Sequence, residues 1–179
     1  YLTVRILAEI EKYLDVKTNH PMPVGKRFGL IVGTSTGGLI ALSLAAGKTA
    51  KEVLDFYEKY GPEIFGKKER RRWGSTIFRP KFKGGVLKKC LQEQLFKEKN
   101  SLSEINDPHV AVTSVALDTG MLRKHASNYF PTHPGREDET LVDIAVATTA
   151  APTFFAVQEA MKHSSDLVDG GLVANNPAM

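Results

Sequence analysis

The sequence has 179 residues, enough for one domain with a sizeable core, and its 42% hydrophobic and 25% charged residues are typical of a globular protein. It contains no run of about 18 apolar residues, a mild net charge of +4, and a single cysteine, Cys90. These features exclude a transmembrane helix, a disulfide framework and a multi-cysteine metal site, and they argue against nucleic-acid binding. We expect a cytoplasmic protein with peripheral membrane contact. Because the chain opens on Tyr1, the lack of a targeting signal carries no weight.

Hydrophobic periodicity predicts buried strands that alternate with helices, which is typical of an α/β layered fold with a mostly parallel sheet. The first helix and the helix that opens with a capping box at Thr49 and Glu52 each have one apolar face. These faces are Leu2, Ile6, Ile10, Tyr13 and Leu14 in the first, and Val53, Tyr57, Tyr60 and Ile64 in the second. The predicted helices cover residues 2–15, 37–46, 86–96 and 141–149, with another from residue 49, and the strands cover 28–32, 110–117, 124–130 and 166–168.

Residues 66–84 show no periodicity and are strongly basic, which predicts a loop or lid. A charge run of this kind is ordinarily a solvated loop. The sharper interpretation is attraction to anionic lipid headgroups, with the tryptophan as an interfacial anchor. The residues of this proposed membrane contact are Lys67, Lys68, Arg70, Arg71, Arg72 and Trp73.

Ser35 lies in the sequence Gly-Thr-Ser-Thr-Gly, which matches the pattern G-x-S-x-G between a predicted strand and a predicted helix. This context is typical of a nucleophile elbow, a sharp turn that exposes a reactive serine. We expect Gly33 and Gly37 to be needed because side chains there would collide with the neighbouring strand and helix. The free N–H groups of the following helix would favour the negative charge of a tetrahedral intermediate.

Two other interpretations of this segment remain open. It could be a glycine-rich turn needed only for close packing of helix and strand. It could also be a phosphate-binding loop, but it lacks the lysine of G-x-x-x-x-G-K-[ST] and the spacing of G-x-G-x-x-G.

A nucleophilic serine needs a base, and none of the histidines is well placed to serve as one. His125 reads as a solvated strand residue, while His133 and His163 stay as candidate bases of a Ser-His-Asp triad. Asp169 is a better candidate because it ends an apolar strand and precedes two glycines, although an Asp-Gly turn is common in itself. A carboxylate is a weak base for a hydroxyl, so we expect Asp169 in an apolar cleft.

Three segments together resemble the patatin-like phospholipase family. They are residues 33–42 around Ser35, residues 147–155 with the sequence Ala-Thr-Thr-Ala-Ala-Pro-Thr-Phe-Phe, and residues 168–177 with Asp-Gly-Gly followed by Asn-Asn-Pro. The resemblance spans most of the chain, with the segments in family order. It implies a three-layer α/β/α fold with a mostly parallel central sheet and the serine on a strand–turn–helix elbow.

The resemblance also implies hydrolysis of lipid esters by a Ser–Asp dyad without a catalytic histidine. Ser35 would be the nucleophile and Asp169 the base, with a lipid ester as substrate and no metal or other cofactor. Backbone support and the oxyanion contact would come from Thr36, Gly33, Gly37, Gly38, Gly170 and Gly171. A transacylase would differ only in the acceptor that meets the acyl-enzyme.

The family carries a glycine-rich Asp-Gly-Gly-Gly-x-Arg-Gly loop that supplies the oxyanion hole, whereas residues 1–7 resemble the helix just after it. We therefore expect residues 1–179 to be one catalytic domain that lacks this loop and the strand before it, with its C-terminal limit left open. The loss of one oxyanion donor typically costs about two to three orders of magnitude in kcat. The 179-residue chain should therefore hydrolyse esters poorly and the full-length parent well; equal rates would contradict this expectation.

Two rival functions remain at this stage. One is an α/β-hydrolase esterase with a histidine triad, which substitution of His133 and His163 would reveal. The other is a catalytically silent lipid- or partner-binding module, which would bind liposomes without turnover and leave Ser35 unlabelled by a fluorophosphonate.

Overall fold

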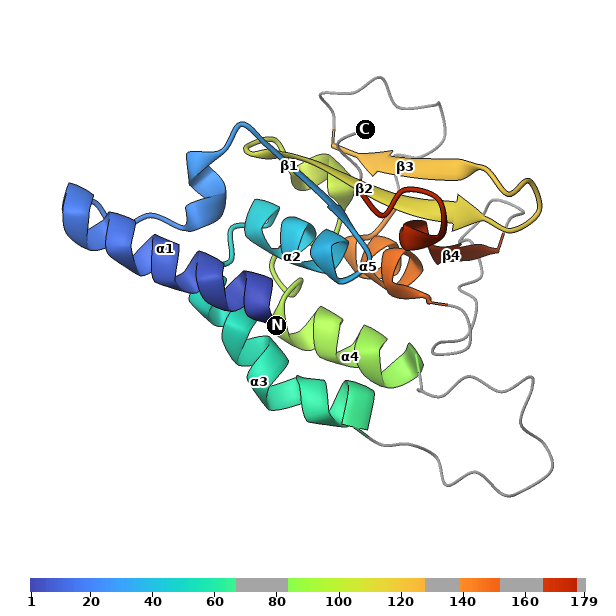
Figure 1. Ribbon diagram of the computed structural model, residues 1–179, viewed down its shortest axis with the longest axis horizontal. Helices are drawn as coiled ribbons and strands as arrows, with labels where there is room; N and C mark the ends of the chain where they lie inside the picture. Colours follow the sequence, from blue (N-terminus) through green and yellow to red (C-terminus); the bar gives the residue numbers. More distant parts are fainter. Residues whose placement is uncertain (67–83, 128–138, 152–165, 177–179) are drawn as a thin grey trace.

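The computed structural model describes residues 1–66, 84–127, 139–151 and 166–176. This part of the chain contains five α-helices and four strands; three helices follow β1 in succession, and β2 and β3 are consecutive strands (Figure 1). The helices are α1 (Leu2–Thr18), α2 (Thr36–Ala45), α3 (Ala50–Gly66), α4 (Gly84–Gln94) and α5 (Leu141–Thr149). The strands are β1 (Leu30–Thr34), β2 (His109–Ala116), β3 (Leu122–Ala126) and β4 (Leu167–Asp169), and the 3-10 turns are η1 (Val24–Arg27), η2 (Leu102–Glu104) and η3 (Gly170–Leu172).

The four strands form a mixed sheet around β2. β1 pairs with β2 in parallel, whereas β3 and β4 pair with it in antiparallel orientation. The prediction of a mostly parallel sheet is therefore wrong for the described strands. The direction of a strand depends on which neighbour it meets, and the apolar pattern of a strand does not encode that choice.

β1 and β4 share one edge of β2 and meet there end to end. β1 and β3 both pair with residues 111–113, and β3 and β4 both pair with residues 114 and 115. Since a strand has two edges, β3 occupies one, and β1 and β4 share the other. β1 ends at Thr34 opposite Thr113, and β4 arrives from the other direction to end at Asp169 opposite Ser114. The C-terminal ends of β1 and β4 therefore lie next to each other, beside Thr113 and Ser114 of β2.

The helices stack in two tiers against the sheet (Figure 1). α2 and α5 pack directly on the strands, and α1, α3 and α4 pack outside them. α2 is apolar around its whole circumference, and residues 38–45 are all buried between the sheet and the outer helices. A fully buried Leu side chain contributes about 1.5–3 kcal/mol to folding, so this central helix anchors the core.

The other face of the sheet is partly open in the described residues. Leu30 and Val32 of β1 point away from α2 and are 44% and 38% exposed. The described part of the chain places its helices on one face, so it shows the sheet and one helical side of the expected three layers.

The capping box and the apolar face of α3 are confirmed. The Thr49 hydroxyl accepts a hydrogen bond from the Glu52 N–H at 3.1 Å, and the Glu52 carboxylate accepts one from the Thr49 N–H at 2.7 Å. Val53, Tyr57 and Ile64 are buried and Tyr60 packs against them.

α1 is a helix, but its apolar face is turned outward. Leu2, Ile6, Ile10 and Tyr13 are between 42% and 69% exposed, whereas an amphipathic helix ordinarily turns such a face to the core. The inward side carries Val4, which is fully buried, Leu7, which packs on the core, and Glu11, which is 6% exposed. Its carboxylate accepts hydrogen bonds from the N–H of Val24 at 2.6 Å and the N–H of Ala50, the first residue of α3, at 3.1 Å. A buried carboxylate at the positive end of a helix thus helps to set the rotation of α1.

Replacement of Glu11 by Ala should lower the free energy of unfolding by about 2–4 kcal/mol, because two buried N–H groups lose their acceptor. Glu9→Ala, at an exposed position of the same helix, is the matched control and should change stability by less than about 0.5 kcal/mol. Urea unfolding of both variants measures the difference. Similar midpoints for the two variants would show that Glu11 does not hold α1 in place.

Candidate active site

Ser35 occupies the turn between β1 and α2 in a strained backbone conformation. Its φ of 57° and ψ of −131° lie in a region that side chains rarely adopt, at a cost of about 1–3 kcal/mol. The residue as a whole is partly exposed. The predicted strand–turn–helix geometry of a nucleophile elbow is therefore present.

Two of the three glycines around Ser35 are required by close packing. A Cβ atom on Gly33 would lie 2.3 Å from the carbonyl oxygen of Gly37, and one on Gly38 would lie 2.8 Å from Val112 Cγ1. A Cβ on Gly37 would meet no described atom within 4 Å. Contrary to expectation, nothing in the described residues makes Gly37 sterically necessary; the neighbouring Gly38 is the glycine whose Cβ position is blocked.

Asp169 lies against the nucleophile candidate. The Ser35 hydroxyl donates to Asp169 Oδ2 at 2.5 Å, although 134 residues separate the two in sequence. The meeting of β1 and β4 on β2 explains this contact, because each side chain lies where its strand ends. The other carboxylate oxygen accepts the N–H of Gly171 at 2.8 Å, which fixes the plane of the carboxylate.

Asp169 is 7% exposed, so it is withdrawn from water as expected. Its hydrogen-bond partners are polar, however, and an apolar cleft does not describe its immediate surroundings. The following Gly170 is needed for this placement, because a Cβ there would lie 2.4 Å from the carbonyl oxygen of Thr113. Gly171 has more room, since the nearest atom to its Cβ position would be Asp169 Oδ1 at 3.1 Å.

Thr36 is the first residue of α2, and its N–H lies in the helical turn that has no acceptor within the helix. Such N–H groups and the helix dipole favour an anion beside the helix N-terminus. A hydroxyl next to a buried carboxylate, with a helix N-terminus beside them, is the arrangement needed for acyl transfer.

The family model described as patatin-like phospholipase matches residues 14–179. The chain belongs to the patatin-like phospholipase family. It is 36% identical to a cGAMP-activated phospholipase of Vibrio cholerae serotype O1, over 98% of this chain and 51% of that protein. It is 34% identical to a cGAMP-activated phospholipase of Escherichia coli, over 98% of this chain and 49% of the relative. It is also 31% identical to patatin-like protein 3 of Arabidopsis thaliana, over 97% of this chain and 46% of the relative. The chain spans about half the length of these relatives.

Three threonines connect the two halves of this patatin-like site and were not singled out from the sequence. Thr34 of β1, Thr113 of β2 and Thr148 of α5 form hydrogen bonds beneath Ser35 and Asp169. The sequence did hold one signal: Thr148 and Thr149 are two polar residues at the buried end of a largely apolar helix, where each hydroxyl needs a partner.

His125 is buried rather than solvated, contrary to expectation. It is 2% exposed and bonds to Ser114 Oγ at 2.8 Å and Glu139 at 2.7 Å, and Arg123 pairs with the same carboxylate at 2.8 Å. In the register of β3 it lies opposite the fully buried Val112, so it faces the core. Burial, the largest influence, raises the pKa of Glu139, but His125 and Arg123 outweigh it and hold that pKa below its usual value.

Several predicted site residues lie outside the described residues. They are the candidate triad bases His133 and His163 and the basic residues Lys67, Lys68, Arg70, Arg71, Arg72 and Trp73. Among the described helices, none combines the length and the apolar character that crossing a membrane requires.

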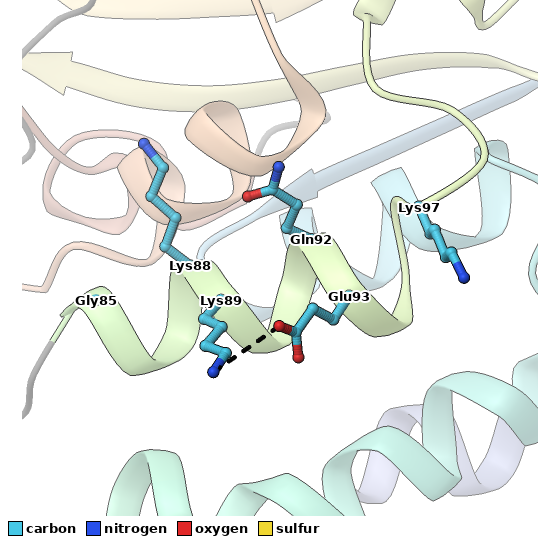
Figure 2. Close-up of a pocket in the computed structure, with 6 residues that line it drawn as sticks. All are labelled: Gly85, Lys88, Lys89, Gln92, Glu93 and Lys97. Carbon is cyan, nitrogen blue, oxygen red and sulfur yellow. Dashed lines mark ion pairs between the residues drawn. The ribbon is translucent and has the colours of Figure 1, made fainter.

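A separate hollow of about 600 Å³ lies along α4 and contains neither Ser35 nor Asp169 (Figure 2). Two of its lysines are paired with carboxylates: Lys88 with Asp143 at 2.8 Å and Lys89 with Glu93 at 3.9 Å. These pairs reduce the attraction of the hollow for an anion. It is lined by Gly85, Lys88, Lys89, Gln92, Glu93 and Lys97.

The two glycines of the G-x-S-x-G motif should respond differently to substitution. Gly33→Ala should lower the free energy of unfolding by about 3 kcal/mol or more, because backbone atoms block the new Cβ. Gly37→Ala should be neutral or stabilising by up to about 1 kcal/mol, since Ala is the better helix former. Thermal unfolding of the pair tests this steric difference. Equal losses in both variants would contradict it.

Proposed function

We propose that Ser35 and Asp169 form the catalytic dyad of a serine lipid acyl hydrolase of the phospholipase A type. The observation that carries this proposal is the 2.5 Å hydrogen bond from the Ser35 hydroxyl to a buried carboxylate, at a strained elbow in a patatin-like chain. The family and the phospholipase relatives support a lipid ester as substrate.

The reaction would proceed in two steps. Ser35 Oγ attacks the ester carbonyl carbon while Asp169 takes the hydroxyl proton, and a tetrahedral oxyanion forms. The carbon–oxygen bond to the alcohol then breaks, Asp169 gives its proton to the leaving oxygen, and the fatty acyl group stays on Ser35. In the second step, water loses a proton to Asp169 and attacks the acyl carbon. The proton returns to Ser35 as the fatty acid leaves. Transfer to another alcohol instead of water would make the protein a transacylase.

The oxyanion would be stabilised by the backbone N–H of Thr36 at the start of α2, together with the glycine-rich loop that the family resemblance implies. Gly33, Gly38 and Gly170 support this geometry through close packing, as their Cβ positions indicate. Gly37 has room for a Cβ among the described residues, whereas a Cβ on Gly171 would press on the Asp169 carboxylate at 3.1 Å.

We also propose that residues 1–179 belong to one catalytic domain with three α/β/α layers, whose second helical layer would cover Leu30 and Val32. The basic segment at residues 67–73 would hold the domain against anionic lipid. A triad that uses His133 or His163 is the alternative; substitution of both histidines would leave a dyad enzyme active. A silent lipid-binding module is the other alternative.

Ser35→Ala and Asp169→Asn should each lower kcat for phospholipid hydrolysis at least about a thousandfold in the full protein. The first change removes the nucleophile, and the second keeps the shape of the side chain but removes the base. Asp166→Asn, three residues earlier and exposed, is the control that should keep full activity. Release of fatty acid from vesicles is the measurement.

Full activity of Asp169→Asn would rule out the dyad. Vesicle binding with no turnover, combined with no labelling of Ser35 by a fluorophosphonate, would identify the silent module instead.

A further inference from the structure

We propose that Thr148 is a positioning residue that holds the backbone of the nucleophile in its reactive conformation. The inference rests on the proposed function of Ser35. Thr148 lies in α5, 113 residues beyond the serine, and is fully buried. It therefore acts through the backbone of Ser35 rather than by contact with a substrate.

The hydroxyl of Thr148 uses both of its hydrogen-bonding roles. It accepts a hydrogen bond from the Ser35 N–H at 2.8 Å. It donates a hydrogen bond to the carbonyl oxygen of Thr113 in β2, also at 2.8 Å. The directions are unambiguous, because the Ser35 N–H only donates and the carbonyl only accepts. The turn is thus tied through one side chain to the central strand of the sheet.

This bond completes the restraint on the two peptide planes that flank Ser35. The plane before Ser35 carries its N–H, which Thr148 holds. The plane after Ser35 carries its carbonyl, which accepts the N–H of Leu39 at 3.1 Å as the first bond of α2. With both planes restrained, φ and ψ of Ser35 are restrained, and so are the directions of its Cα–Cβ bond and of the Thr36 N–H, while the hydrogen bond to Asp169 orients Oγ. The bond to the Ser35 carbonyl comes from α2 itself and is present in any turn that leads into a helix. The bond to the Ser35 N–H depends on one side chain, Thr148, which can be replaced by mutation.

Thr148 packs closely against Gly38. A Cβ on Gly38 would lie 2.9 Å from Thr148 Oγ1 and 3.0 Å from its methyl carbon. The side chain therefore fills the space that Gly38 leaves open. This contact gives Gly38 a specific role, since a larger residue there would displace the hydroxyl that holds Ser35.

The anchor of Thr148 is also an anchor of the base. The Thr34 hydroxyl donates to the carbonyl oxygen of Ala174 at 3.0 Å, so in its 2.7 Å bond with the Thr113 hydroxyl it must accept. Thr113 thus accepts the Thr148 hydrogen bond at its carbonyl oxygen. Its hydroxyl is connected through Thr34 to Ala174, in the segment that follows Asp169. A displacement at Thr148 would therefore shift the nucleophile relative to a base that stays in place.

The test is Thr148→Val in the full protein, because Val keeps the shape of Thr and removes both hydrogen bonds. We expect kcat for phospholipid vesicles to fall about 10- to 100-fold with KM unchanged, as small misplacements of reacting groups have effects of this size. The rate of Ser35 labelling by a fluorophosphonate should fall by a similar factor. Thr148→Ser, which retains the hydroxyl, should restore both rates to within about threefold of the original protein.

Thr149→Val is the matched control. Thr149 is the next residue of α5 and is also buried, but its hydroxyl bonds to the helix carbonyls of Ala145 at 2.7 Å and Val146 at 3.2 Å. Its loss should leave kcat and labelling unchanged. If Thr148→Val does not fold, Thr148→Ala against Thr149→Ala gives the same comparison.

Equal kcat values in the Thr148 and Thr149 variants would overturn the proposal, and so would a loss in Thr148→Ser as large as that in Thr148→Val. Failure of the proposed function looks different: Ser35→Ala would then retain hydrolysis whatever happens at Thr148. Loss of activity in Ser35→Ala with no effect of Thr148→Val would reject the positioning role alone.

Discussion

The pairing of two strands with one edge of β2 is the constraint on which the rest of this site depends. β1 and β4 approach along that edge from opposite directions and end at neighbouring residues of β2. Backbone hydrogen bonds therefore place the first residue beyond β1 next to the last residue of β4. No long side chain is needed to bring a serine and an aspartate together across 134 residues of sequence.

Close packing sharpens this placement. The turn at Ser35 is strained, and a strained turn persists only where its surroundings hold it. Gly33 permits the chain to fold back on itself, Gly38 permits α2 to approach β2 and α5, and Gly170 permits the segment after β4 to lie on the Thr113 carbonyl. At Gly33 and Gly170 the neighbouring atoms include backbone, and at Gly38 they are the side chains of Val112 and Thr148.

Structural features that depend on sequence patterns a few residues long were predictable. The helices, the strands, the capping box at Thr49 and the elbow at Ser35 all follow from patterns a few residues long. Features set by tertiary pairing were not. The sheet direction, the outward face of α1, the burial of His125 and the exchange of roles between Gly37 and Gly38 depend on neighbours distant in sequence. Asp169 was predictable in part. Its strand followed from the apolar pattern, but its pairing with Ser35 was expected only from the family resemblance.

The end-to-end meeting of β1 and β4 also bears on how such a chain can change over evolution. The proposed base registers with β2, and the proposed nucleophile directly follows the last registered residue of β1, so the sheet sets the positions of both. Changes of length outside the helices and strands would then leave the serine and the aspartate where they are, whereas α3 and α4, which lie between α2 and β2, contribute buried side chains to the core. The fold thus separates a proposed chemical centre that tolerates little change from the connections outside the helices and strands, where length can vary.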